Sequence, residues 1–270
     1  SLGQRGYVIP RPHRSLVTRR ILVMERLDGF SFDDVEGMRA AGIDTEDVVR
    51  VGMRGFAEGC MIHGLFHGDL HGGNLLVMPN GNIGLLDHGI TARMTPLQRN
   101  AFLRLMLLGA AGDIPGQIAA FRDLGALPAD VDIGEIMVDL GLDQAPVDPT
   151  SMSQEQLVGE IQKITKALLG FGAKIPKILM LYVKNLVFLD GAIASLAPDL
   201  DLLAEFSELS AHMAVNHGAH IAGELGVDPA ELAVDREAIK ASFGIVDPDV
   251  ESVTYAELQQ RRELIRKRLA

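Results

Sequence analysis

The sequence is poor in cysteine and in aromatic side chains. Its 270 residues include one cysteine, no tryptophan and 5% aromatic residues. A single cysteine cannot form a disulfide within the chain, which favours a reducing compartment. Cys60 lies in an apolar helical stretch, where a free thiol is usually a core residue. Because aromatic residues are so scarce, a surface that stacks nucleic-acid bases is not expected.

Positive charge is also in short supply. The chain has 25 lysines and arginines against 36 aspartates and glutamates, a net charge of −11, and its first lysine is Lys163. Nucleic-acid affinity comes mainly from cations that neutralise phosphates, so no nucleic-acid partner is predicted. An acidic protein can still bind a nucleotide through Mg²⁺, which prefers carboxylate ligands.

No uninterrupted apolar run is long enough to suggest a membrane span, and no signal peptide is evident. The most apolar stretch, residues 175–197, contains Lys177, Lys184, Asn185 and Asp190. Lys184 and Asp190 are expected to be solvated or to cap the helix, with a buried polar network as the alternative. A cytoplasmic location is therefore predicted. Peripheral membrane contact is an additional hypothesis, because the predicted last helix, 255–268, is amphipathic and basic.

The predicted elements are a few short strands followed by many helices. An apolar run at Ile21–Met24 predicts a strand, and Pro79-Asn80-Gly81 predicts a turn between two short strands. Helices are predicted at 45–63, after Thr95-Pro96, at 153–171, 176–196 and 201–225, and at the end of the chain. The fold class indicated is mainly α with a few short strands.

The most informative stretch is FHGDLHGGNLLVMPNGNIGLLDHGI, residues 66–90. His67 and His71 are four residues apart, as in zinc-binding helices, but the glycines at 68, 72 and 73 oppose a helix and no HExxH motif is present. A zinc site is therefore not favoured.

Phosphoryl transfer fits this stretch better. Kinase-like sites use an aspartate to orient the acceptor hydroxyl, an asparagine five residues later, and a second aspartate on a DFG-type turn. Asp69 and Asn74 have that spacing, and Asp87 follows the second strand in Asp87-His88-Gly89. The turn between the strands is expected to bring Asn74 and Asp87 to the same end, where their oxygens could share one cation.

With these motifs, the chain resembles the UbiB-like (aarF-domain) atypical kinase family. The resemblance rests on VIPRPHRSLVTRRILVMERLDG, on GLFHGDLHGGNLLVMPNGNIGLLDHGITARMT and on IPKILMLYVKNLVFLDGAIASLAPDLDL, and it covers residues 7–205. It implies a protein-kinase-like C-lobe that uses ATP and Mg²⁺, with an N-lobe largely absent. The domains expected are a hinge strand and N-lobe remnant at 1–30, the C-lobe at 31–205 and a helical extension at 206–270.

The resemblance also implies a role for individual residues. Asp69 would be the catalytic aspartate, and His67 the catalytic-loop histidine that braces the DFG-type turn. Asn74 and Asp87 would bind the metal. The nucleotide-binding residues it implies, beside Asn74, are Met24 as gatekeeper and Glu25 and Leu27 as hinge residues that bond adenine through their backbone.

Two departures from the family pattern stand out. His88 replaces the usual phenylalanine of DFG, and a catalytic role for it is not required. The phosphate-covering loop and strand lysine of a kinase-like N-lobe have no counterpart before Ile21. The chain therefore resembles a C-lobe, expected to be part of a longer protein and to bind MgATP weakly by itself.

Three functions are open at this point. The resemblance favours an ATPase-type kinase-like protein linked to isoprenoid quinone biosynthesis or lipid homeostasis, with a quinone precursor or lipid as partner. The HGDLH wording also suggests an aminoglycoside- or choline-type phosphotransferase, although the match at 176–203 counts against it. The missing N-lobe suggests a non-catalytic binding module.

Overall fold

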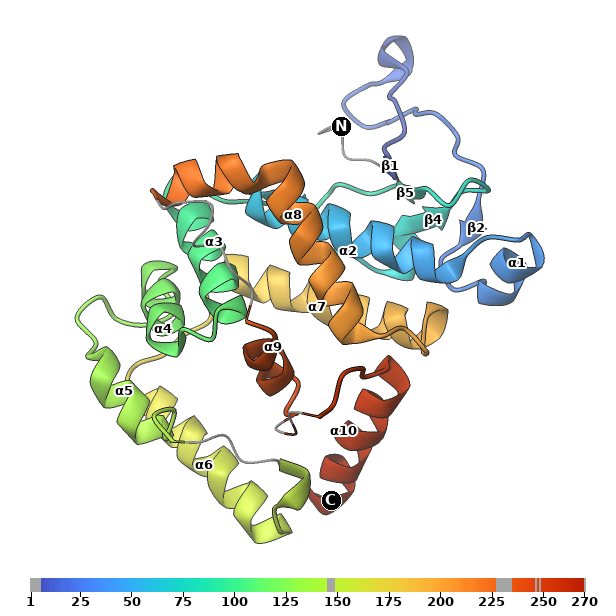
Figure 1. Cartoon of the computed structure of the whole chain (residues 1–270). Coiled ribbons are helices and arrows are strands. Elements are labelled where there is room, and N and C mark those ends of the chain that lie inside the picture. The colour runs from blue at the N-terminus through green and yellow to red at the C-terminus, as the bar shows by residue number, and fades with distance from the viewer. Residues whose placement is uncertain (1–5, 145–148, 227–234, 246, 248, 270) are drawn as a thin grey trace. The chain divides into compact units, whose positions relative to one another are not determined.

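The computed structural model describes residues 6–144, 149–226, 235–245, 247 and 249–269. They are mainly helical with a few short strands, as predicted (Figure 1). The strands are β1 (Tyr7–Val8), β2 (Phe30–Ser31), β3 (Leu65–His67), β4 (Leu75–Val77), β5 (Ile83–Leu85) and β6 (Thr91–Arg93). The α-helices are α1 (Val35–Ala40), α2 (Thr45–Met61), α3 (Pro96–Ala110), α4 (Ile114–Asp123), α5 (Ile133–Leu140), α6 (Gln154–Gly170), α7 (Lys177–Leu196), α8 (Leu202–Leu225), α9 (Arg236–Ser242) and α10 (Tyr255–Leu269). Three short 3₁₀ helices are η1 (Arg14–Leu16), η2 (Gly72–Asn74) and η3 (Pro149–Ser151).

The chain divides into two compact units. The first contains residues 1–93 and 180–200, and the second contains 94–179 and 201–270. The first unit therefore holds every strand described and most of α7. The domain boundaries expected from the sequence, at 30 and 205, stay a prediction.

A small sheet organises the first unit. Its strand order is β1-β5-β4-β2, with β1 parallel to β5 and the other neighbours antiparallel. The predicted hairpin is confirmed as β4 and β5, with Leu75 opposite Leu85 and Val77 opposite Ile83. Gly81 has a φ of +79° in the connecting turn, which only glycine adopts without strain. A second, two-stranded sheet pairs β3 with β6.

Glycines on α2 allow the backbone of this helix to approach the strands closely. An alanine methyl group at Gly55 would lie 1.6 Å from the Tyr7 ring, and one at Gly59 would lie 2.9 Å from the Leu65 carbonyl oxygen. The Tyr7 hydroxyl donates a hydrogen bond of 2.9 Å to the Gly52 carbonyl oxygen of the same helix. Small residues along α2 therefore fix β1 and β3 against it.

An aromatic cluster joins α2, β3 and α7. The Phe56 ring stacks on Tyr182 at a centroid distance of 5.4 Å, and Phe66 meets Phe56 edge-on at 5.7 Å. Such arrangements are favourable for aromatic pairs. Cys60 is buried, as predicted, and burial raises the pKa of its thiol. Cys60 is therefore a core residue, like the rings beside it.

The strand predicted at Ile21–Met24 is wrong. The structure has only an isolated bridge between Met24 and Pro12, flanked by hydrogen bonds of 2.8 Å from the His13 N–H to the Val23 carbonyl and from the Glu25 N–H to the Arg11 carbonyl. Ile21 and Leu22 are 59% and 64% exposed. A strand pattern becomes a strand only where its apolar face is covered, and these side chains are not covered.

In the second unit, α3, α6 and α10 begin where the sequence predicted. Thr95 and Ser153 form capping boxes at the starts of α3 and α6. Thr254 and Glu257 bond reciprocally before α10. Side-chain oxygens at these positions satisfy N–H groups that a helix leaves unpaired, which explains why these boundaries could be predicted.

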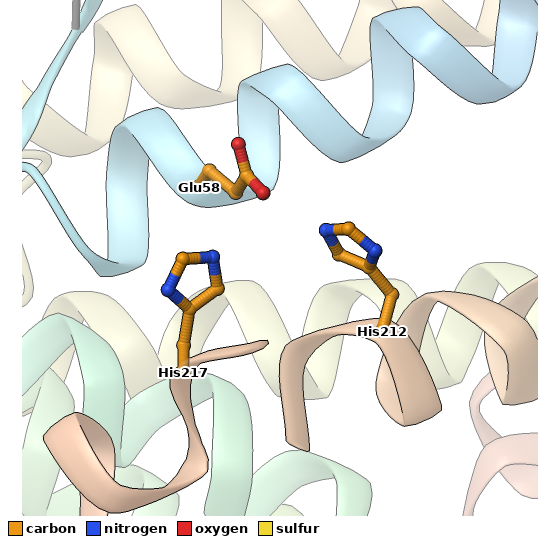
Figure 2. A group of neighbouring side chains, drawn as sticks. All are labelled: Glu58, His212 and His217. Carbon is orange, nitrogen blue, oxygen red and sulfur yellow. The ribbon is translucent and has the colours of Figure 1, made fainter. Parts of the chain in front are cut away.

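Helix α8 carries two neighbouring histidines. His212 and His217 have ring centroids 6.3 Å apart in an edge-on arrangement, and Figure 2 shows both on α8. Glu58, which the same figure labels, lies on α2 and belongs to the first unit. Their edge-on contact is consistent with a packing role.

The close approach of α2 to β1 gives a first prediction. Gly55→Ala should lower the free energy of unfolding by about 1–3 kcal/mol, because the added methyl group collides with the Tyr7 ring. Gly159→Ala is the matched control. Gly159 lies inside α6 with no atom within 4 Å of the added methyl group, so this change should stabilise by about 0.5–1 kcal/mol. Denaturant titrations of both variants measure the difference, and equal stabilities would contradict the packing described.

Candidate active site

The β4–β5 hairpin brings two of the predicted site residues to one end. Asn74 directly precedes β4 and Asp87 follows β5 by two residues, and the Leu86 N–H donates a 3.0 Å hydrogen bond to the Asn74 carbonyl. The expected placement of Asn74 and Asp87 at the same end is therefore what the strand register produces. The preceding loop, which runs from Gly68 to Asn74, carries Asp69.

His67 joins this loop to the turn that contains Asp87. Its Nδ1 accepts a 3.1 Å hydrogen bond from the Asp69 N–H, and its Nε2 contacts the Asp87 carbonyl oxygen. An Nδ1 that accepts leaves the proton of a neutral ring on Nε2, which then donates to the carbonyl. The imidazole thus links the two aspartates through their backbones rather than through their carboxylates.

The side chain of Asn74 is oriented by Asp69. The Asn74 Nδ2 donates a 3.1 Å hydrogen bond to the Asp69 carbonyl oxygen, and the Asn74 N–H donates one of 2.9 Å to the His71 carbonyl. The amide orientation is fixed by this donor, so Oδ1 is the atom that remains suited to a cation. His71, which was not predicted to take part in the site, accepts a hydrogen bond from the Gly73 N–H and caps η2.

Asn185, which sequence reasoning did not assign to the site, holds the loop from the other side. It lies on α7 and is completely buried. Its Oδ1 accepts a 3.1 Å hydrogen bond from the Leu70 N–H, and its Nδ2 donates to the His67 carbonyl. Buried polar groups require such partners, so this amide ties the loop to α7 on both sides of Asp69. The interruption of an apolar helix by Asn185 was the available signal.

The carboxylate of Asp69 has a partner on the same helix. The Lys184 ammonium forms an ion pair with Asp69 Oδ1. This hydrogen bond holds the pKa of the Asp69 carboxyl below its ordinary value, and the positive charge of Lys184 acts in the same direction. Asn185 therefore forms the buried polar network that was the alternative expectation, whereas Lys184 is solvated, as first expected, and pairs with Asp69 from the exposed side of the helix.

The Asp87 turn is stabilised locally. The Gly89 N–H donates a 2.7 Å hydrogen bond to Asp87 Oδ1. The His88 ring lies edge-on to His67 at 5.7 Å, and partial burial lowers the pKa of His88. Both rings line a cavity of about 260 Å³ whose other walls include Tyr7, Phe56, Phe66, Leu70 and Leu85. His88 therefore takes part in the packing around the turn.

The predicted nucleotide-hinge residues do not join this hydrogen-bonded group. The N–H of Glu25 is bonded to Arg11, and Met24 lies beside Pro12. Leu27 packs toward Gly84 on β5, where an added methyl group would lie 2.9 Å from Leu27 Cδ1. The roles of Met24, Glu25 and Leu27 in adenine binding stay predictions, as do those of the loop residues.

The donor set suits a hard divalent cation. Asn74 Oδ1 and the Asp87 carboxylate are amide and carboxylate oxygens on one end of a hairpin, and Mg²⁺ prefers such oxygens over nitrogen or sulfur. Asp33 is a further carboxylate near the loop, since its Oδ2 would lie 2.7 Å from a methyl group at Gly72. The residues present therefore fit the expected Mg²⁺ site.

Two observations bear on membrane contact. Among the described residues, α7 is the one helix with the length and apolar composition of a membrane span, which by itself is weak evidence. In α10, the Arg261 guanidinium donates to the Gly244 carbonyl, and Arg268 donates to the carbonyls of Thr150 and Met152. These basic groups serve contacts within the second unit, and peripheral membrane contact stays a prediction.

Comparison with known proteins confirms the predicted resemblance to UbiB-like kinases. Residues 4–116 match the family described as ABC1 atypical kinase-like domain. The Arabidopsis thaliana protein named Activity of BC1 complex kinase 1, chloroplastic, is 27% identical over 198 residues, which are 72% of this chain and 29% of that protein. An uncharacterized chloroplastic aarF domain-containing protein kinase of the same plant is 26% identical over 219 residues, 73% of this chain and 41% of that protein.

The chain thus spans less than half the length of these relatives. Among solved structures, the complex of Rv3197 with erythromycin from Mycobacterium tuberculosis aligns with a TM-score of 0.35 and 15% identity, over 71% of this chain and 52% of that one. A likeness of that size carries no argument about this chain.

The Asn185 contacts give the second prediction. Asn185→Ala should lower the free energy of unfolding by about 2–4 kcal/mol, because it leaves the buried Leu70 N–H and His67 carbonyl unpaired. Asn216→Ala is the control, since Asn216 is exposed and donates within its own helix α8. That change should alter stability by less than about 0.5 kcal/mol. Thermal and denaturant unfolding compare the two, and a loss no larger at Asn185 than at Asn216 would argue against the loop anchor.

Proposed function

We propose that this chain, a member of the UbiB-like (aarF-domain) atypical kinase-like family, binds MgATP and serves phosphoryl transfer of the ATPase type. The observation that carries the proposal is the arrangement of Asp69, Asn74 and Asp87 around the β4–β5 hairpin. His67 joins the loop of Asp69 to the turn of Asp87. Phosphoryl transfer depends mainly on positioning and on charge stabilisation, and this arrangement provides groups for both.

Each side chain has a separate task in this proposal. Asn74 Oδ1 and the Asp87 carboxylate would hold Mg²⁺, which when bound neutralises charge on the nucleotide phosphates. The Asp69 carboxylate would accept a hydrogen bond from the attacking water or hydroxyl and orient its oxygen toward the phosphorus. His67 would keep Asp69 and the Asp87 turn in register through the two backbone contacts described above.

The nucleotide affinity of the chain alone should be weak. Kinase-like folds hold the phosphates with a covering loop and a strand lysine, and residues 1–162 contain no lysine. Adenine would be met by the backbone near Met24, Glu25 and Leu27. The site described here therefore supplies the metal-binding and hydroxyl-orienting half of the reaction.

The process served is proposed from the family resemblance alone. It favours isoprenoid quinone biosynthesis or lipid homeostasis, with a quinone precursor or lipid as the partner. The alternative is an aminoglycoside- or choline-type phosphotransferase, because the HGDLH motif is common to both groups. That alternative predicts no resemblance to the UbiB-like family in residues 176–203, where this chain does resemble it. Those residues include Lys184 and Asn185, whose contacts hold the loop.

The third prediction tests the metal-nucleotide site. At about ten times Kd, MgATP should stabilise the chain by about 1.4 kcal/mol, a rise in Tm of about 3–5 °C. Asp87→Asn should remove the Mg²⁺-dependent part of this shift. Asp69→Asn should keep the shift but lower ATP turnover by about 10²-fold or more, because Asp69 orients the nucleophile rather than the metal.

Asp130→Asn is the matched control, because Asp130 is an exposed carboxylate in the second unit. It should leave both the Tm shift and turnover unchanged. Thermal unfolding with ATP, with Mg²⁺ and with both, together with phosphate release, provides the measurements. The proposal fails if wild type shows no Mg²⁺-dependent shift, or if Asp87→Asn shows the same shift as wild type.

A further inference from the structure

Lys184 is not part of the motif that contains Asp69, yet its side chain contacts that residue. It lies 115 residues after Asp69, on α7, and its ammonium pairs with Asp69 Oδ1. The loop itself, residues 68–74, contains no lysine or arginine. The nearest imidazole, His71, accepts a hydrogen bond from Gly73 at Nδ1. The permanent positive charge beside Asp69 therefore comes from α7 rather than from the loop.

The neighbours of Lys184 on its own helix offer it no other acidic partner. The positions three and four residues away are Met180, Leu181, Val187 and Phe188, and none is acidic. Side chains at these spacings are the ones that meet on a helix surface. None of these four positions of α7 therefore competes with Asp69 for the ammonium.

Asn185, the residue after Lys184, fixes the position of Lys184 relative to the loop. Asn185 is buried and bonded to Leu70 and to the His67 carbonyl, so this turn of α7 is fixed to the loop that carries Asp69. Lys184 starts from that fixed point and extends to the exposed side of the helix. Its side chain is 52% exposed and that of Asp69 is 28% exposed. Exposed ion pairs contribute little to stability, so the fold does not depend on this contact.

We infer that Lys184 is a positioning residue for Asp69: it holds Oδ1 of the carboxylate and so presents Oδ2 to the attacking hydroxyl. This inference rests on the proposed function. In the step concerned, the hydroxyl oxygen forms the new bond to the γ-phosphorus, and the bond from that phosphorus to the bridging oxygen of ADP breaks. ADP leaves with the electron pair, and the hydroxyl proton passes to Asp69 Oδ2.

Kinetics on the full chain test the consequence. Lys184→Met should lower kcat for ATP hydrolysis about tenfold or more, while KM for MgATP changes by less than about twofold. Lys184→Arg should retain most of the turnover, since a guanidinium can also hold Oδ1. Lys177→Met is the matched control: the same replacement, on the same helix, of an exposed lysine two turns away. It should behave like wild type.

A double substitution separates positioning from a direct contact with phosphate. If Lys184 acts through Asp69, then Lys184→Met should have little further effect in an Asp69→Asn background. Multiplicative losses would show that Lys184 acts independently of Asp69 and would overturn the inference. Equal kcat in wild type and Lys184→Met, or faster turnover in Lys184→Met, would overturn it as well.

Zero-length cross-linking tests the contact without any activity. A water-soluble carbodiimide activates a carboxylate, which a touching lysine amine converts to an amide. Mass spectrometry of the wild type should identify a peptide that joins Asp69 to Lys184, and Lys184→Arg, which lacks an amine, should not form it. Absence of the wild-type cross-link overturns the inference. A cross-link in a wild type without ATP turnover instead rejects the proposed function, and with it the role of this ion pair in turnover.

Discussion

The buried amide of Asn185 is the interaction on which the geometry of the site depends. The loop from Gly68 to Asn74 is rich in glycine and has little regular structure of its own, so its conformation must be imposed from outside. Asn185 bonds one backbone group before Asp69 and one after it. In a buried position both bonds are required, because an unpaired amide or peptide group costs about 1–3 kcal/mol. The loop therefore has one favourable position against α7.

On this turn of α7, Asn185 has a structural role and Lys184 has a role in the proposed chemistry. Successive residues of an α-helix point about 100° apart, so a buried Asn185 leaves Lys184 toward solvent. The inward residue fixes the backbone of the loop, and the outward residue contacts the carboxylate that the loop presents.

Much of the fold could be predicted because its signals are local. Helix starts at Thr95, Ser153 and Thr254 depend on side chains within three residues of each other, and the β4–β5 turn depends on Gly81. The pairings of β1 with β5 and of β3 with β6 depend on contacts between distant segments, and β1, β3 and β6 were not predicted. The error at Ile21–Met24 has the same origin, because a β-type sequence says nothing about whether another element covers it.

In the site, too, the local features could be predicted and the contacts between distant segments could not. The motif around Asp69, Asn74 and Asp87 is contiguous, so the arrangement of its residues followed from one hairpin. The partners of that motif, Lys184 and Asn185, are more than 100 residues away, and the only sign of them was polarity inside an apolar helix. The resemblance extended across both segments, yet a resemblance does not state which side chains touch. Those contacts depend on how α7 packs, which the sequence pattern alone does not determine.

The distribution of charge connects these observations with the proposed chemistry. The site contains the carboxylates of Asp69 and Asp87, and like charges repel each other at short range. Lys184 compensates Asp69, and the Gly89 N–H compensates Asp87 only in part. An incoming divalent cation would therefore favour Asp87 and Asn74, where negative charge and a free amide oxygen remain. Asp69 would be left as a carboxylate beside the metal rather than on it, which is the condition under which it can orient a hydroxyl group.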